Sequence, residues 1–352
     1  MDSYEKFMEK LGSLPFDSPR TESKVEIEIL NGLMTPDQAE IACNLSAMPE
    51  PVAAIAERAG MDAKELSATL DALVKKGVIF KVYTEEPLYS LVSMFPGIIE
   101  FQVGRLTPED VERWNRYYDE KLGRAVLDSQ PQMTRIVPVA KSIPTEMNVF
   151  TYEEVEKLID GATAITLVDC ICRAKKKLIG EKGCDAPVKD TCIYLDSWAD
   201  YFAENNLGRR ASKDEAKITL RRNRDAGLVH NAFNVQQGAV GICSCCACCC
   251  ILLRGISELK IPSAVAKSNF IAEISHDACT GCGVCVDRCP VHAMEIVNDV
   301  AQLVEDRCIG CGVCEVFCEF DAISLKRRDK IVQPPADLNE FMAQRMAGRL
   351  KG

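Results

Sequence analysis

Apolar residues recur at helical spacing in the first third of the chain. Residues 63–76 carry an apolar side chain every three to four positions, which predicts an amphipathic helix that ends at Gly77. Thr35 stands before a proline and so begins an earlier helix, and residues 52–59 form another that Gly60 ends. The pattern therefore predicts a run of short packed helices before residue 77.

The periodicity then changes from helical to alternating. Residues 78–82 and 88–92 alternate apolar and other positions on either side of a turn at 84–87, which predicts a hairpin. Helices followed by a hairpin resemble a winged helix. Thr107 caps one further helix over residues 107–123. We expect residues 1–130 to form a winged-helix-like domain with this helix after it.

The middle of the chain mixes both periodicities. Residues 134–140 and 163–169 are strand candidates. Two capping patterns predict helices: Thr151 with Glu154, for a helix to about Ile159, and Ser212 with Glu215, for a helix that ends at Gly227. Residues 131–272 should therefore form an α+β domain, and the whole chain is predicted to be a multi-domain α+β protein.

The last segment, residues 327–352, reads as a basic C-terminal helix that Asp337 can cap. Its apolar side chains are expected on one face: Leu338, Phe341, Met342, Met346 and Leu350. Arg345 and Arg349 would lie outside that face. Docking on the protein's own core is the favoured interpretation, with a partner helix as the alternative.

Residues 273–326 carry the clearest chemical motif. The run C-x2-C-x2-C-x3-C occurs twice, as Cys279, Cys282, Cys285, Cys289 and again as Cys308, Cys311, Cys314, Cys318. Three thiolates at this spacing hold three corners of a 4Fe-4S cubane, and in two-cluster ferredoxins the fourth ligand comes from the other run. A zinc ribbon would leave the third and fourth cysteines of each run without a use, and disulfides do not suit a reducing cytoplasm.

The crossed arrangement predicts two ligand sets in this ferredoxin domain. One cluster is expected on Cys279, Cys282, Cys285 and Cys318, and the other on Cys308, Cys311, Cys314 and Cys289. Glycines such as Gly281 and Gly310 should let the backbone turn tightly and bring amide groups towards the sulfurs.

The predicted middle domain holds a second concentration of cysteines, ten in number. They are Cys170, Cys172, Cys184, Cys192, Cys243, Cys245, Cys246, Cys248, Cys249 and Cys250. One cubane needs only four ligands, so at least one further iron-sulfur cluster is expected, with zinc as the alternative. Adjacent cysteines on an extended segment point to opposite sides, which favours two sites, or one site with spare thiols. The sequence does not decide which of the ten ligate.

Composition narrows the function. The 19 cysteines suit metal binding better than a disulfide framework in a reducing cytoplasm, and no long apolar span or leader pattern appears. The net charge of −10 argues against broad DNA binding. Residues 273–325 carry 2 basic and 10 acidic side chains, net −8, so the ferredoxin domain is acidic. We expect a cytoplasmic protein with redox partner proteins, as a subunit of a complex or an oligomer.

Together the motifs resemble a family of anaerobic bacterial and archaeal proteins that joins a winged-helix-like domain, a cysteine-rich middle domain and a two-cluster ferredoxin domain. The matching residues, besides the ferredoxin runs, are Cys170–Arg173, Gly183–Asp185 and Ile242–Cys250. The resemblance implies electron transfer in anaerobic metabolism and implies no substrate.

The leading hypothesis is an iron-sulfur electron-transfer protein or subunit that relays electrons between a low-potential donor and a partner oxidoreductase. A redox-sensing winged-helix transcription regulator is the alternative, although the helix at 63–76 mixes acidic with basic residues and has no arginine or asparagine to read a base. An enzyme with its own site at the middle cysteines is a third reading. It lacks an evident general base, because the chain has only three histidines and no phosphate-binding glycine motif.

Overall fold

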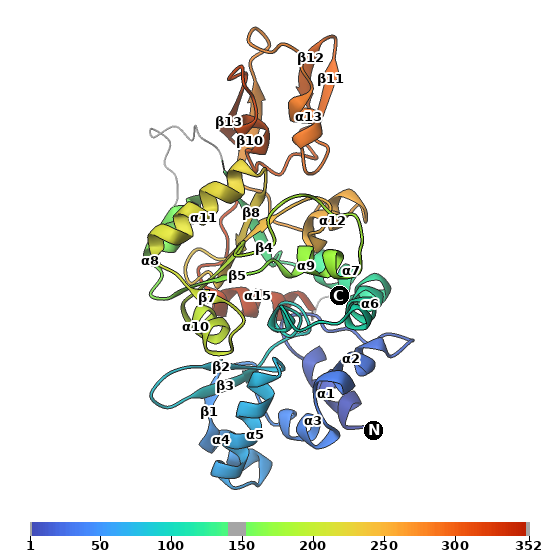
Figure 1. Cartoon of the computed structure of the whole chain (residues 1–352), viewed down its shortest axis with the longest axis vertical. Coiled ribbons are helices and arrows are strands. Elements are labelled where there is room, and N and C mark those ends of the chain that lie inside the picture. The colour runs from blue at the N-terminus through green and yellow to red at the C-terminus, as the bar shows by residue number, and fades with distance from the viewer. Residues whose placement is uncertain (1, 140–152, 350–352) are drawn as a thin grey trace.

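The computed structural model describes residues 2–139 and 153–349. Its N-terminal part packs five helices beside a small antiparallel sheet of order β1-β3-β2 (Figure 1). These elements are α1 (Ser3–Gly12), α2 (Val25–Leu33), α3 (Pro36–Ala42), α4 (Val52–Ala59), α5 (Ala63–Lys75), β1 (Glu50–Pro51), β2 (Ile79–Val82) and β3 (Leu88–Leu91). The predicted helix ends at Gly60 and Gly77 are confirmed, and both glycines adopt positive φ. Helix α1 was not predicted.

A helical connector follows the hairpin. It comprises η1 (Glu100–Gln102), α6 (Pro108–Tyr117), the π-helical turn η2 (Tyr118–Leu122) and α7 (Gly123–Asp128). Thr107 forms the predicted capping box at the start of α6, but the helical run continues past residue 123 to Asp128. The Tyr118 hydroxyl donates to the carbonyl of Ile251 at 2.8 Å, which ties this connector to the middle of the chain.

The middle domain is built on one antiparallel sheet of order β4-β8-β9-β6-β5-β7. Its strands are β4 (Thr134–Val137), β5 (Ile165–Val168), β6 (Cys192–Leu195), β7 (Arg209–Arg210), β8 (Val229–Phe233) and β9 (Gly241–Cys245). Its helices are α8 (Val155–Gly161), α9 (Ile171–Leu178), α10 (Asp196–Glu204), α11 (Lys213–Asp225) and α12 (Ile251–Ser257). The Ser212 capping box is confirmed, whereas Thr151 lies outside the described residues.

The ferredoxin domain lies at one end of the molecule (Figure 1). It consists of β10 (Phe270–Ile274), α13 (Val284–Arg288), β11 (Met294–Val297), β12 (Val300–Leu303), α14 (Val313–Val316) and β13 (Ile323–Arg327). Strand β10 pairs with β13 from Phe270↔Arg327 to Ile274↔Ile323, so this sheet starts three residues before the predicted boundary at 273.

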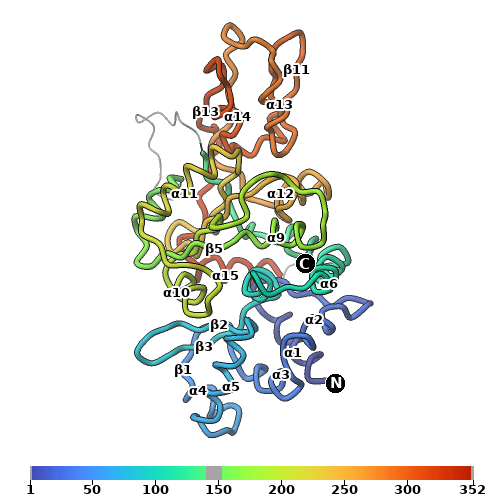
Figure 2. The backbone as a smooth tube through the Cα atoms, viewed as in Figure 1, coloured from blue at the N-terminus to red at the C-terminus, as the bar shows by residue number. Residues whose placement is uncertain are grey.

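The C-terminal helix α15 (Leu338–Arg349) returns to the N-terminal part, as the backbone trace of Figure 2 shows. Phe341 is fully buried, with its ring 5.7 Å from that of Phe16 and 5.0 Å from that of Phe233. Helix α15 therefore docks on the protein's own core, as the favoured interpretation of the sequence expected.

The predicted facing of the C-terminal helix was wrong in part. Arg345 is 2% exposed, whereas Met346 is 39% exposed, and Leu350 lies outside the described residues. The guanidinium of Arg345 lies over the rings of Phe16 and Phe341 and 3.9 Å from a carboxylate oxygen of Asp17. Stacking on aromatic faces and a nearby acid let an arginine take the inner position.

No helix among the described residues is long and apolar enough to cross a membrane.

Candidate metal centres

The eight ferredoxin cysteines lie in two groups, each of which takes thiols from both sequence runs. The first group is Cys279, Cys282, Cys285 and Cys318, and the second is Cys289, Cys308, Cys311 and Cys314. The second group lines one small cavity, together with apolar side chains of β10 and β13. The fourth cysteine of each run therefore lies with the first three of the other run.

Backbone amides are directed at the thiols of this domain. The N–H groups of Ala293, Ala301 and Ala322 donate to the sulfurs of Cys289, Cys279 and Cys318 at 3.1, 3.3 and 3.3 Å. Such bonds stabilise a thiolate and the extra charge of a reduced cluster. Burial has the opposite effect, because it raises the pKa of Cys311 to about 12. The Cys311 thiol is therefore protonated without metal, and binding a metal must release its proton.

The two groups differ in their surroundings. Cys282 is exposed, while Cys308, Cys311 and Cys314 are all buried. The backbone of the second run is held by the middle domain and the segment after β13: Val139 N–H donates to the Cys311 carbonyl at 2.9 Å, and Arg328 donates to the Cys308 carbonyl at 2.9 Å. The first group is thus the outer one, and the second faces the rest of the protein.

Six of the ten middle-domain thiols form a closed ring. Each interacts electrostatically with two others, in the order Cys170, Cys172, Cys250, Cys245, Cys243, Cys192 and back to Cys170. All six line a cavity of about 60 Å³, together with neighbouring side chains such as Glu100 and Tyr194. We call this group the six-thiol ring. It is mostly buried, and Cys172 and Cys243 are its two half-buried members.

The sheet register explains the ring. In the β6–β9 pair Ile193 lies opposite Ile242, so Cys192 and Cys243 are neighbours across the two strands. In the β5–β6 pair Val168 lies opposite Cys192, which brings Cys170, two residues past Val168, to the same end of the sheet. The ends of three strands therefore converge, and the start of α9 and of α12 supply the remaining thiols.

Arg173 borders the ring and is 3% exposed. Its guanidinium donates to the carbonyls of Pro187 and Ser244 at 2.9 and 3.0 Å, while its Nη2 has no hydrogen-bond partner among the described residues. Hydrogen bonds from Cys172 and Cys192, followed by the charge of Arg173, hold the pKa of Cys170 well below its usual value. A buried cation with an unused donor beside thiols fits an anionic metal cluster.

The other four middle-domain cysteines form a second, separate group. The sulfurs of Cys184, Cys246, Cys248 and Cys249 all lie within 4.8 Å of one another. We call them the four-thiol group. Cys245 and Cys246 belong to different groups, but Cys248 and Cys249 lie together, because residues 246–249 leave the extended strand and form a turn. Arg173 Nη1 lies 3.8 Å from the sulfur of Cys246 and so stands between the two groups.

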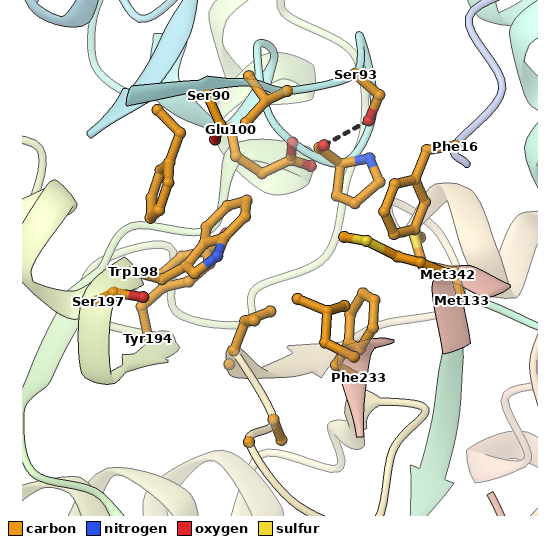
Figure 3. Close-up of a pocket in the computed structure, with 18 of the residues that line it drawn as sticks. Phe16, Ser90, Ser93, Glu100, Met133, Tyr194, Ser197, Trp198, Phe233 and Met342 are labelled. Carbon is orange, nitrogen blue, oxygen red and sulfur yellow. Dashed lines mark hydrogen bonds between the residues drawn. The ribbon is translucent and has the colours of Figure 1, made fainter. Parts of the chain in front are cut away.

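A larger cavity of about 400 Å³ adjoins the six-thiol ring (Figure 3). Aromatic side chains from three parts of the chain line it, among them Phe16, Trp198 and Phe233. Glu100, Tyr194 and Cys243 line both this cavity and the ring cavity, and so form the wall between them. Burial raises the pKa of Glu100 to about 7, although the Gly97 N–H donates to this carboxylate at 2.7 Å.

Sequence reasoning did not find Glu100 or Tyr194, because neither belongs to a cysteine motif and both reach the site only through the fold. Arg173 was visible beside its C-x-C motif.

His230 is buried, with Nδ1 3.2 Å from the Ser244 hydroxyl. Burial lowers the pKa of His230 to about 4, so its imidazole is neutral and its role is structural, within strand β8.

Comparison with known families supports the ferredoxin domain. Residues 271–319 match the family described as 4Fe-4S dicluster domain. No curated protein matches the chain. The fold and the match together establish an iron-sulfur domain at the C-terminal end and a cysteine-rich candidate metal centre in the middle of the chain.

Gly281 and Gly283 give a matched test of how closely the chain wraps the outer group. Both adopt positive φ, but a Cβ on Gly281 would lie 2.3 Å from the Asp299 carbonyl oxygen, whereas one on Gly283 would meet nothing within 4 Å. We expect Gly281→Ala to lose about half of the ferredoxin-domain iron, because the Asp299 backbone cannot yield. Gly283→Ala should retain it, with a strain of about 1 kcal/mol. Equal iron contents in the two purified variants would contradict this.

Cys289→Ser tests the crossed grouping. The substitution should disturb the cluster that Cys308, Cys311 and Cys314 hold, and should spare the one on the outer group. Cys318→Ser is the mirror variant. EPR and paramagnetic NMR of the reduced proteins distinguish the two clusters, and damage restricted to the run that contains the substitution would refute the grouping.

Proposed function

We propose that the protein relays electrons through three iron-sulfur centres to or from a partner oxidoreductase. Two are 4Fe-4S clusters, one on Cys279, Cys282, Cys285 and Cys318 and the other on Cys289, Cys308, Cys311 and Cys314. The third occupies the six-thiol ring. The observation that carries the proposal is the division of the ferredoxin thiols into two sets of four, each with a cysteine from the opposite run.

A polynuclear cluster suits the six-thiol ring better than a single ion does. Six thiols exceed the four ligands that a tetrahedral ion takes, and all six line one cavity. The unpaired Nη2 of Arg173 would donate to a cluster sulfide, and the guanidinium charge would offset the cluster's negative charge. These features favour iron and sulfide in the ring.

The exposed residues of the ferredoxin domain indicate where a redox partner would dock. The outer ferredoxin group contains the exposed Cys282, and the apolar side chains of Val284 and Phe320 nearby are 38% and 48% exposed. The acidic surface of this domain would attract a basic partner. We place partner docking at this outer cluster and the inner cluster between it and the middle domain.

The N-terminal part fits a role in protein docking better than one in DNA recognition. Lys81 donates to the carboxylate of Asp71 on α5 at 2.6 Å, and Lys76 donates to the side-chain oxygen of Gln38 at 2.8 Å. These two lysines therefore form hydrogen bonds within the protein. The redox-sensing regulator therefore remains the weaker alternative. Its signature would be a gel shift at low salt that depends on cluster redox state.

Iron and sulfide analysis of anaerobically purified protein tests the relay. We expect about eight iron atoms from the ferredoxin domain and at least four more from the six-thiol ring. The triple variant Cys172→Ser, Cys192→Ser, Cys245→Ser should lose the ring iron and keep the ferredoxin iron, because it leaves three ring thiols, fewer than the four ligands of a cubane. Cys43→Ser is the control, since Cys43 lies in the N-terminal part. Wild-type protein with only eight irons, or ring-variant protein with no iron loss, would contradict a cluster in the ring.

The 400 Å³ cavity favours a second candidate function, the reduction of a small apolar molecule next to the ring. Its aromatic walls suit a planar molecule, and Cys243, itself a member of the ring, lines the cavity directly. Reduction would add two electrons, one from each of two reduced clusters, and two protons, one from the Glu100 carboxyl and one from water, across a double bond of the substrate.

Ligand binding tests this candidate. In reduced protein, 2-naphthol should shift the EPR signal of the ring cluster and leave the ferredoxin signals unchanged, because only the ring adjoins the cavity. Ser197→Phe should abolish the shift by filling the cavity that Ser197 lines. An equal change in the ferredoxin signals, or no change at all, would argue against a substrate site.

A further inference from the structure

The four-thiol group has the dimensions of a site for one ion. The sulfur of Cys248 lies 3.7 Å from that of Cys246 and 3.5 Å from that of Cys249. Four sulfurs at 2.3 Å from a tetrahedral ion are about 3.8 Å apart, from the geometry of a regular tetrahedron. The four thiolates of a cubane stand farther out, about 6 Å apart, because each binds a different iron at a corner of the cube. With all sulfurs within 4.8 Å, the group is too compact to hold a cubane.

We propose that Cys184, Cys246, Cys248 and Cys249 bind one tetrahedral zinc ion, separate from every iron-sulfur centre. Four cysteines that close the coordination sphere are typical of structural zinc, which leaves no position open for a substrate. None of the four belongs to the six-thiol ring, so the zinc site and the ring cluster require no common ligand.

A buried cation stands beside one corner of the group, the sulfur of Cys246. Arg173 lies 3.8 Å from that sulfur and would remain beside it as a cation against the net negative charge of a four-thiolate zinc centre.

The ion would join two segments that are distant in sequence. Cys184 lies in the loop after α9, and the other three lie in the turn between β9 and α12. Both segments also carry ring thiols: Cys172 lies in the first turn of α9, and Cys245 and Cys250 stand on either side of the turn. Gly183 packs against the turn, since a Cβ there would lie 3.4 Å from the sulfur of Cys249. The zinc would therefore act as a redox-inert clamp that holds the ring ligands in register.

Metal analysis of full-length protein, purified anaerobically, tests the proposal. We expect one zinc per chain in addition to iron. Cys184→Ser should reduce bound zinc at least tenfold after a chelator challenge, and Cys43→Ser should keep it. The triple ring variant Cys172→Ser, Cys192→Ser, Cys245→Ser should lose ring iron and retain zinc, which separates failure of the ring cluster from failure of the zinc site. Zinc-free wild-type protein, or iron lost from Cys184→Ser in place of zinc, would overturn the proposal.

A second measurement keeps the test valid if Cys184→Ser does not fold. X-ray absorption at the zinc edge of wild-type protein should give four sulfur neighbours at about 2.3 Å. Nitrogen or oxygen neighbours would place the zinc elsewhere and refute the site. Cobalt-substituted protein should show the visible bands of tetrahedral Co²⁺ with thiolate ligands, and bands of six-coordinate cobalt would likewise count against it.

Discussion

The convergence of three strand ends in the central sheet is the constraint on which the middle of this protein depends. Strands β5, β6 and β9 are neighbours, and their register places Cys170, Cys192 and Cys243 at the same end of the sheet. Strand pairing holds Cys192 and Cys243 without any metal, and the Cys170 N–H, past the end of β5, donates to the Val188 carbonyl at 2.9 Å. A shift of one residue in this register would turn Cys192 or Cys243 to the opposite face of the sheet, so strand pairing and metal binding must agree.

Arg173 links the chemistry of the two middle-domain thiol groups. It lies on the first turn of α9, its guanidinium reaches the β9 backbone at Ser244, and it approaches the sulfur of Cys246. A charge at this depth is costly unless it is paired, and thiolates on both sides would supply that pairing. An Arg173→Met change would remove the hydrogen bond to the sulfur of Cys246 and the positive charge beside Cys170.

The large cavity arises where the N-terminal part, the central sheet and α15 meet. Phe16, Trp198 and Met342 come from three distant parts of the chain and face the same space (Figure 3). The C-terminal helix closes it because Phe341 packs between Phe16 and Phe233. The N-terminal part therefore supplies one wall of the cavity next to the six-thiol ring.

The sequence by itself predicted the iron-sulfur motif of the ferredoxin domain, because local turns bring the first three cysteines of each run together whatever the rest of the fold does. The fold of the domain then brings the fourth thiol of each group from the other run. Helix ends at Gly60, Gly77 and Ser212 were equally local and equally predictable. Only the tertiary structure divided the ten middle cysteines into two groups. Strand register places Cys192 in the six-thiol ring. Cys248 and Cys249 both lie in the four-thiol group, because they occupy a turn and not a strand. The tertiary structure also placed Arg345 on the buried face of α15 and Glu100 beside the six-thiol ring. Burial of these residues depends on which distant surfaces meet, and the pattern of apolar positions along the sequence does not contain that information.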